Sequence, residues 1–143
     1  DLKQFRPSLV RRELNKAFAA FEATESMRRG GGQSTWPHLI TGNWGCGDFG
    51  GVVELKFVIQ LMAAAHAGRG LTYCTLNDKE LAAKLEDIHS ILVCRGATVG
   101  EIVEELRTLD RVQRNKGERV DMANFFRDGA AAYVEMLAAA EAE

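Results

Sequence analysis

The sequence predicts an α/β fold with a helical annex at its C-terminal end. Two short apolar runs with the character of strands, residues 36–41 and 71–76, lie on either side of a long apolar segment with the character of a helix. Only helical patterns follow residue 79. Such alternation of strand and helix in the middle of a chain is typical of α/β proteins. Two strands make a poor sheet alone, so we expect the missing strands to come from a segment before Asp1 or from a companion chain.

Apolar spacing and capping signals place the helices. Apolar residues three and four positions apart predict helices over residues 8–24, 52–67 and 79–93, a fourth helix after Thr98, and a last one from about residue 121 into the alanine-rich tail. Gly68 and Gly70 are expected to end the second helix. Thr98 with Glu101 three residues on forms a capping box. Residues 111–119 are expected to be a charged connector.

Composition limits the function classes. A chain of 143 residues suits one domain with a real core. Its net charge of −2 gives no broad electrostatic grip on nucleic acid or an anionic membrane, and no apolar run approaches the roughly 18 residues of a membrane span. The three cysteines lack the clustered spacing of a zinc site, so we expect no metal and mostly buried, reduced thiols in an intracellular, reducing compartment.

A glycine-rich segment, residues 41–51, is the strongest local signal. Five glycines fall within its last ten residues, between an apolar run and the start of the long apolar helix. Such a turn can cradle a phosphate, because backbone N–H groups and the helix N-terminus favour an anion. It can equally be a tight structural turn. It is not a Walker A loop, and although Gly45, Gly47 and Gly50 fit GxGxxG, no acidic residue closes the next strand as a dinucleotide fold requires, since Asp78 is as well explained as a helix cap.

The segment from Thr41 to Gly51, followed by Glu54-Leu55-Lys56, closely resembles the diphosphate-binding loop of poly(ADP-ribose) glycohydrolases. Residues 4–7, 11–18, 71–78 and 98–100 resemble the same family, so the similarity covers about residues 4–109. It implies the C-terminal half of a macrodomain-like mixed sheet flanked by helices. It also implies an enzyme that hydrolyses the ribose–ribose O-glycosidic bonds of poly(ADP-ribose) to release ADP-ribose.

The resemblance assigns substrate-binding residues one by one. Phe49 is expected to pack against the distal ribose, and Leu76 stands where the family commonly has an aromatic ring. Asp48 lies inside the loop, where a carboxylate repels a diphosphate unless it points outward. Val52 stands where the family usually has Asp. The residues expected to contact the diphosphate and ribose are Asn43, Gly45, Cys46, Gly47, Asp48, Phe49, Gly50 and Leu76.

No catalytic residue is expected in this chain. The family's signature is a triple glycine followed several residues later by Gln-Glu-Glu, in which one glutamate protonates the leaving oxygen. Gly30-Gly31-Gly32-Gln33 is not that signature, because no Glu-Glu follows, and Glu104-Glu105 is expected on a solvated helix face. We therefore expect residues 1–143 to be the C-terminal part of a glycohydrolase catalytic domain, which binds ADP-ribose weakly and cleaves nothing until an upstream segment or partner chain supplies the glutamates.

Other interpretations stay open at this point. The chain could be a non-catalytic ADP-ribose-binding module, or a structural element whose loop is a relic. The expected partners are poly(ADP-ribose) or ADP-ribose and a complementary N-terminal segment, in the nucleus or cytoplasm, with no cofactor, membrane or direct nucleic-acid contact. Lys56 and Arg69 are expected to be balanced by Asp48 and Glu54. Trp44 is expected to pack under the loop rather than serve as a stacking platform, Cys46 to be a thiol rather than a nucleophile, and His38 and His66 to be structural.

Overall fold

The computed structural model describes residues 1–22, 27, 29–30, 37–129, 135 and 138. They form two compact units, one of residues 8–79 and one of residues 1–7 with 80–143, and each unit is described by itself. The glycine run at residues 31–33, Trp36 and most of the alanine-rich tail, for which the sequence makes predictions, lie outside the described residues.

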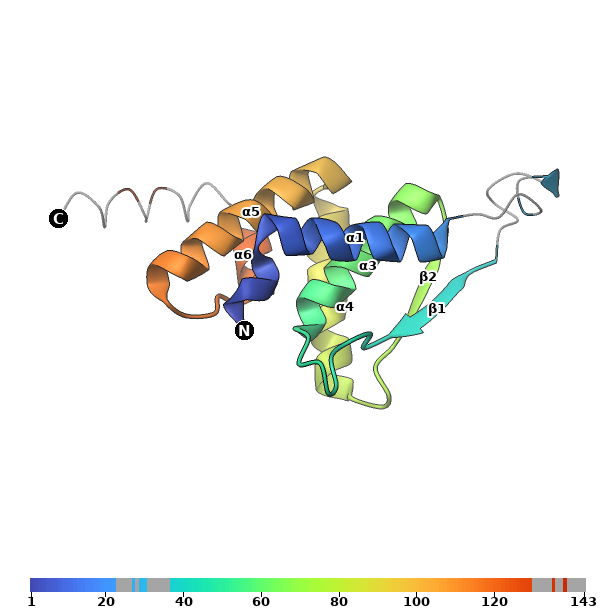
Figure 1. The fold of residues 1–143 in the computed structure, drawn as a ribbon, viewed down its shortest axis with the longest axis horizontal. Helices are drawn as coiled ribbons and strands as arrows, with labels where there is room; N and C mark the ends of the chain where they lie inside the picture. Colours follow the sequence, from blue (N-terminus) through green and yellow to red (C-terminus); the bar gives the residue numbers. More distant parts are fainter. Residues whose placement is uncertain (23–26, 28, 31–36, 130–134, 136–137, 139–143) are drawn as a thin grey trace. The chain divides into compact units, whose positions relative to one another are not determined.

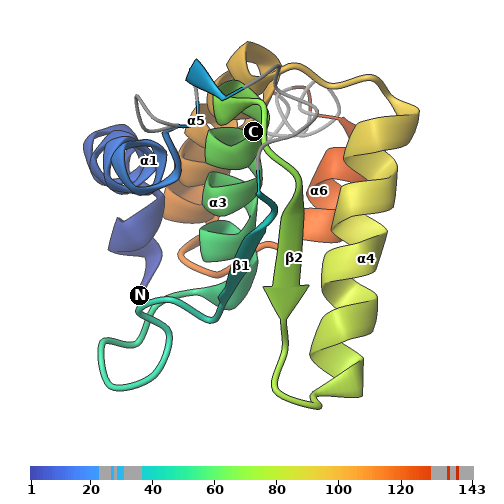
Figure 2. The same cartoon turned by 90° about the vertical axis from the view of Figure 1, so that its right-hand side faces the viewer.

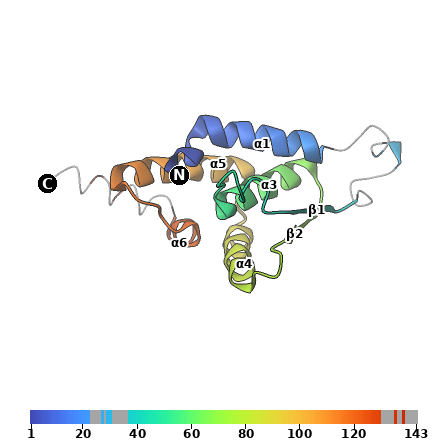
Figure 3. The same ribbon diagram turned by 60° about the horizontal axis from the view of Figure 1, so that its bottom comes forward.

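The unit of residues 8–79 stacks a helix, a second helix and a small sheet. Its elements are α1 (Pro7–Phe21, which enters the unit at Ser8), β1 (Leu39–Gly42), α3 (Val53–Ala67) and β2 (Leu71–Cys74) (Figure 1). The strands lie side by side against α3 in Figure 2, and α1 lies on the other side of α3 in Figure 3. The predicted order of strand, glycine-rich loop, helix and strand is therefore confirmed.

The two strands are parallel, with Leu39 opposite Leu71 and Gly42 opposite Cys74. Burial alternates along β2 and over the first three residues of β1, as expected for a sheet with one covered face, and Gly42 at the end of β1 departs from the alternation. The prediction of a buried first strand is wrong for Ile40, whose side chain is 77% exposed. In the described part of the chain only the face toward α3 is covered, whereas parallel sheets are normally covered on both faces.

Helix α3 is the centre of this unit. Its apolar character all round predicts burial on most faces, and nine of its fifteen residues are buried. It ends where the sequence predicts, because Gly68 adopts the left-handed conformation (φ 67°) that glycine reaches without strain.

The other unit is helical, with a 3₁₀ turn η1 (Leu2–Phe5) and helices α4 (Lys79–Cys94, in this unit from residue 80), α5 (Val99–Lys116) and α6 (Met122–Asp128). Its fully buried side chains include Phe5, Leu106, Phe125 and Phe126. The capping box of Thr98 and Glu101 is confirmed, and hydrogen bonds from the Thr98 backbone and side chain lower the pKa of Glu101.

Two predictions in this unit need correction. Residues 111–116 continue α5 instead of forming a connector, because Val112 and Gln113 are buried and Gly117 (φ 70°) ends the helix. The solvated face expected at residues 104–105 holds for Glu104 but not for Glu105. The Glu105 side chain is only 15% exposed and forms an ion pair of 2.7 Å with Arg95.

Candidate functional site

The glycine-rich loop leaves the carboxyl end of β1 and makes two tight turns before α3. The N–H of Cys46 donates to the Asn43 carbonyl (3.0 Å), and the N–H of Gly50 donates to the Gly47 carbonyl (2.8 Å). Gly45 (φ 71°) and Gly50 (φ 61°) adopt left-handed conformations that disfavour side chains. At Gly51 a Cβ atom would lie 2.5 Å from the Gly45 carbonyl oxygen, so the loop closes on itself there only with glycine.

These turns leave three consecutive amides unused. The backbone N–H groups of Gly47, Asp48 and Phe49 have no hydrogen-bond partner in the described part of the chain, and all three residues are exposed. The loop leads directly into α3, whose N-cap residue Val52 has no side chain able to cap the helix. Free amides beside an uncapped helix N-terminus are an arrangement that binds anions.

The side chains predicted to touch a ligand belong to two segments that leave the same end of the sheet. Because β1 and β2 are parallel, the loop after β1 and the turn after β2 leave from the same end of the sheet (Figure 2). Phe49 is 90% exposed and Leu76 is 83% exposed. Leu76 (φ 54°) and Asn77 (φ 67°) both have left-handed backbones, which is costly for a leucine and is found at binding sites. Asp48 is also exposed.

Asn43 is oriented from below the loop by Tyr73 of β2. The Tyr73 hydroxyl donates to Asn43 Oδ1 at 3.0 Å, which leaves the Asn43 amide nitrogen without a partner among the described residues. Burial, with the nearby Cys46 and Glu54, raises the pKa of Tyr73, so the hydroxyl keeps its proton. The sequence analysis missed Tyr73, although it stands at an inward position of the predicted second strand.

Gln60 fixes the end of β1 on α3. Thr41 Oγ1 donates to Gln60 Oε1 at 2.5 Å, and Gln60 Nε2 donates to the Gly42 carbonyl at 3.2 Å. Gln60 is 1% exposed, so its amide is satisfied within the protein by the segment that begins the loop. The signal was present in the sequence as a polar residue in an otherwise apolar helix.

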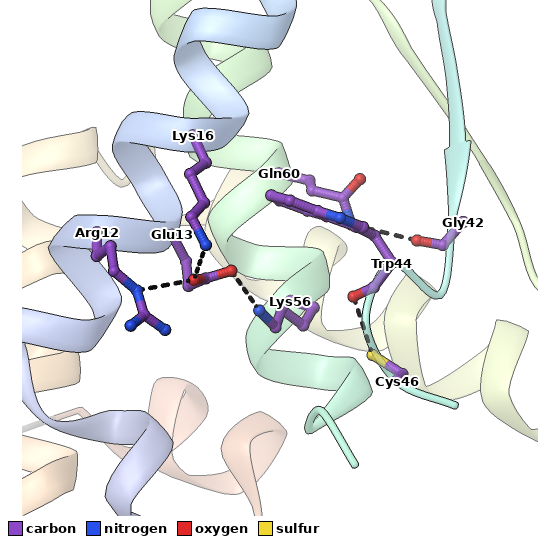
Figure 4. Close-up of polar contacts among 8 residues, drawn as sticks. All are labelled: Arg12, Glu13, Lys16, Gly42, Trp44, Cys46, Lys56 and Gln60. Carbon is purple, nitrogen blue, oxygen red and sulfur yellow. Dashed lines mark hydrogen bonds and ion pairs between the residues drawn. The ribbon is translucent and has the colours of Figure 1, made fainter. Parts of the chain in front are cut away.

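Lys56 supports the loop from the first turns of α3 (Figure 4). Its ammonium lies 2.6 Å from Glu13 Oε2 on α1 and 5.3 Å from the centre of the Trp44 ring. Burial opposes ionisation of Glu13, but hydrogen bonds from Lys56 and Lys16 prevail and lower its pKa to about 2. The ion-pair partner of Lys56 is thus Glu13, which the sequence analysis did not name.

Arg69 closes the other end of this unit. Its guanidinium donates to the Pro37 carbonyl at 2.7 and 3.0 Å and to the Phe21 carbonyl at 3.2 Å. It therefore joins the end of α1 to the start of β1 and does not pair with an acidic residue near the loop in the described part of the chain.

Cys46 has the properties of a structural thiol. Burial raises its pKa, with Lys56 lowering it and Glu54 raising it further, so the nucleophilic thiolate is disfavoured. The prediction of mostly buried thiols is wrong, because Cys74 and Cys94 are exposed and Cys46 is half-buried. The described residues contain no group of three His, Cys, Asp or Glu that could hold a metal ion.

Three further residues differ in how well the sequence placed them. Trp44 is 41% exposed with a cation near its ring, so its prediction as a residue packed under the loop is wrong. His66 packs edge-on against Phe18 at 4.8 Å, as a structural residue does. The His38 ring packs so closely on Gly70 that a Cβ at Gly70 would lie 2.5 Å from it.

Among the described helices, none is both long and apolar enough to span a membrane.

A parallel sheet with a glycine-rich loop at its carboxyl edge is the arrangement of α/β proteins that bind phosphorylated ligands. Comparison with known proteins identifies the family. Residues 1–83 match the model described as poly(ADP-ribose) glycohydrolase (PARG), Macro domain fold, and the chain belongs to this family.

Named relatives agree. Poly(ADP-ribose) glycohydrolase 1 of Caenorhabditis elegans is 37% identical over 98 residues, 68% of this chain and 12% of the relative. Poly(ADP-ribose) glycohydrolase 2 of the same organism is 35% identical over 101 residues, 71% of this chain and 20% of the relative. A probable poly(ADP-ribose) glycohydrolase 2 of Arabidopsis thaliana is 37% identical over 69 residues, 48% of this chain and 13% of the relative. The chain thus spans a fifth or less of the length of these relatives.

Proposed function

We propose that this chain is the diphosphate-binding part of a poly(ADP-ribose) glycohydrolase, an enzyme that hydrolyses ribose–ribose O-glycosidic bonds of poly(ADP-ribose). The observation that carries the proposal is the run of unpartnered, exposed amides at Gly47, Asp48 and Phe49 in front of α3. A diphosphate there accepts hydrogen bonds from backbone donors and gains from the helix dipole. The names of the relatives supply the substrate.

Each predicted site residue has a role in this proposal. The amide nitrogen of Asn43 donates to the ligand, while Tyr73 holds its oxygen. The N–H groups of Cys46 and Gly50 close the turns, so these two residues shape the loop and Gly47 to Phe49 donate. Gly45 supplies the left-handed turn. The exposed Phe49 ring packs against ribose, and Leu76 offers aliphatic contact where the family commonly stacks a ring.

The chemical step needs a carboxylic acid from outside this chain. Cleavage of a glycosidic bond requires protonation of the leaving oxygen while positive charge develops on the sugar. In the proposal, residues 1–143 are the C-terminal part of the catalytic domain, and a complementary N-terminal segment or chain brings the Gln-Glu-Glu sequence and completes the sheet. The free thiols of all three cysteines support a reducing compartment, the nucleus or cytoplasm.

Calorimetric titration of ADP-ribose into the 143-residue chain tests the diphosphate site. A Cβ at Gly47 meets no atom within 4 Å, so Gly47→Ala should keep the melting temperature within about 2 °C and weaken binding about tenfold or more. Gly47→Glu adds a repelling charge and should abolish measurable binding.

Gly100→Ala is the matched control for this titration, because it also adds a methyl group at an uncrowded glycine, here in α5, where the Cβ would meet only Thr98 Oγ1 at 4.0 Å. It should bind ADP-ribose as the unaltered chain does. Unchanged affinity in both Gly47 variants, or no heat from the folded unaltered chain, would overturn the proposed diphosphate site.

A further inference from the structure

We propose that Arg12, Lys16 and Trp44 form a second ligand subsite beside the glycine loop, which binds a neighbouring phosphate–ribose–adenine unit of the polymer. This inference rests on the proposed function, because it assumes that the loop holds one ADP-ribose unit. It adds a surface that distinguishes a polymer from the free nucleotide.

Positive charge exceeds negative charge at this place. Glu13 is the single carboxylate shared by three cations, with Arg12 Nε at 3.2 Å, Lys16 Nζ at 3.0 Å and Lys56 Nζ at 2.6 Å (Figure 4). The pKa of Glu13, about 2, means that it is ionised at neutral pH. These four side chains together carry a charge of +2, which Glu54, whose charge acts on Cys46 of the loop, offsets in part, on a chain whose net charge is −2. Such a local field attracts a polyanion.

Two of the three cations, Arg12 and Lys16, have N–H groups available to bind a ligand. The Arg12 and Lys16 side chains are 60% and 54% exposed, whereas Lys56 is only 12% exposed and is held by Glu13. The two terminal nitrogens of Arg12 have no partner among the described residues, since only its Nε meets Glu13. A guanidinium with both terminal nitrogens available can bind a phosphate with two parallel hydrogen bonds.

Trp44 adds a surface for a base. Trp44 belongs to the glycine loop and is 41% exposed, and the Lys56 ammonium lies 5.3 Å from the centre of its ring. Exposed aromatic rings beside cationic groups are how proteins bind flexible polyanions that carry bases, because rings stack on bases while cations meet phosphates. Adenine in the polymer supplies the base and the repeated diphosphates supply the charge.

Lys56 connects this cluster to the loop. It is the fourth residue of α3, and its ammonium lies 3.9 Å from the position of a Cβ on Gly45. The cluster therefore adjoins the loop at Gly45, two residues before the first of the unpartnered amides. A chain of linked ADP-ribose units can engage both places, whereas a single unit on the loop needs only one.

The test compares free ADP-ribose with a short linear oligomer of poly(ADP-ribose). Binding of both to the 143-residue chain is measured between 50 and 200 mM salt, for the unaltered chain, the double variant Arg12→Gln/Lys16→Gln and Trp44→Leu. The double variant should bind the oligomer about three- to thirtyfold more weakly at 50 mM salt, and its slope of log affinity against log salt should fall by about 1. Trp44→Leu should weaken oligomer binding without changing the salt slope. Free ADP-ribose should bind the unaltered chain and the double variant alike.

Lys84→Gln/Arg107→Gln is the matched control, because these cations are also 55% exposed and paired with single carboxylates, but in the helical unit. It should leave both ligands unaffected. The inference is overturned if the double variant binds the oligomer normally, if the control loses as much, or if free ADP-ribose is weakened equally. If the unaltered folded chain binds neither ligand, the proposed function itself fails. If the melting temperature of the double variant is clearly lowered, the single variant Arg12→Gln replaces it in the comparison. On a logarithmic scale, its loss of oligomer affinity should be about half that expected for the double variant.

Discussion

At the scale of single residues, Glu13 holds together the surface beneath the glycine loop. Its carboxylate joins α1 to Lys56 of α3 with both side chains 12% exposed, and Lys56 in turn lies against Trp44. A partly buried ion pair stabilises only while both groups are charged, and loss of one partner leaves the other charge uncompensated. The pH at which Glu13 takes up a proton therefore matters for the unit of residues 8–79.

We expect the ion pair of Glu13 to stabilise the fold above about pH 4.5 and to be lost in acid. The folded pKa, about 2, lies below the ordinary value of 4.5, so the unfolded chain binds the proton first as pH falls. Stability is then lost progressively between those two pH values. Urea unfolding of the unaltered chain and of Glu13→Gln, at several pH values from 7 to 2.5, should show Glu13→Gln less stable at pH 7 by about 1–3 kcal/mol. The two curves should converge in acid.

Glu104→Gln is the control for this comparison, because Glu104 pairs with Arg107 on an exposed helix face. Its stability should follow that of the unaltered chain at every pH. A constant gap between Glu13→Gln and the unaltered chain from pH 7 to 2.5 would contradict the assignment.

The sequence indicates candidate residues where they form a continuous motif, and it does not indicate partners that are distant along the chain. Asn43 to Gly50 were recognisable because they follow one another in one loop. Glu13 and Lys56 are 43 positions apart, and Asn43 and Tyr73 are 30 apart, so only the folded chain brings them together. The exposure of Trp44 and Cys74 was also not predicted, because tryptophan and cysteine are residue types that are often buried.

At the scale of elements, the loop depends on how β1 is attached to α3. A strand of four residues has few ladder hydrogen bonds of its own. Gln60 supplements them by meeting the Thr41 hydroxyl and the Gly42 carbonyl at the point where the loop begins. Gln60 thereby fixes the start of the loop, and with it the loop amides, relative to α3, which is the most buried helix of its unit.

We expect Gln60→Met to move the loop and not only to destabilise the fold. Methionine has a similar volume but leaves the Thr41 hydroxyl and Gly42 carbonyl without their partner, which costs about 1–3 kcal/mol. ADP-ribose affinity, measured by calorimetry at a temperature where the variant is folded, should fall severalfold. Gln113→Met is the matched control. It removes a buried glutamine that accepts from the Val120 N–H in the helical unit, so it should lower stability and leave affinity unchanged. Equal affinities of Gln60→Met and Gln113→Met would contradict the role of Gln60.

The types of the helices and strands were predictable from the sequence, whereas the residues at which they begin and end were less predictable. Helix α3 and its glycine stop, the capping box of α5 and both strands follow from apolar spacing and local capping chemistry. The extension of α5 to Lys116 did not follow from the sequence, because the charged residues at positions 111, 114 and 116 suggested a connector. In the structure Val112 and Gln113 are buried, which explains why the helix continues. The turn η1 lies in four residues whose helical character depends on the Asp1 cap.

At the scale of the whole molecule, we propose that the chain supplies the diphosphate-binding loop of its family and that another segment supplies the acid of the reaction. It belongs to the poly(ADP-ribose) glycohydrolases but spans 12–20% of the length of its C. elegans relatives. The Ile40 side of its two-stranded parallel sheet is exposed in the described part of the chain. Both observations support a complementary segment that covers the sheet and carries the acidic residues of the reaction.

We expect the 143-residue chain alone to release no ADP-ribose from poly(ADP-ribose), and the chain combined with the complementary N-terminal segment to release it. The expected reason is chemical. In the proposal the loop donates hydrogen bonds to a diphosphate, but none of the predicted site residues is an acid placed to protonate the leaving ribose oxygen. Asp48, the one acid among them, is exposed on the loop. Release is measured by chromatography of the products after incubation with labelled polymer. Replacing the glutamates of the Gln-Glu-Glu sequence in the added segment with glutamine should abolish release while ADP-ribose still binds. Gly47→Ala in this chain should reduce release together with affinity. Release by the isolated chain would show that the acid lies within residues 1–143, and binding without release by the combined protein would identify a non-catalytic ADP-ribose-binding module.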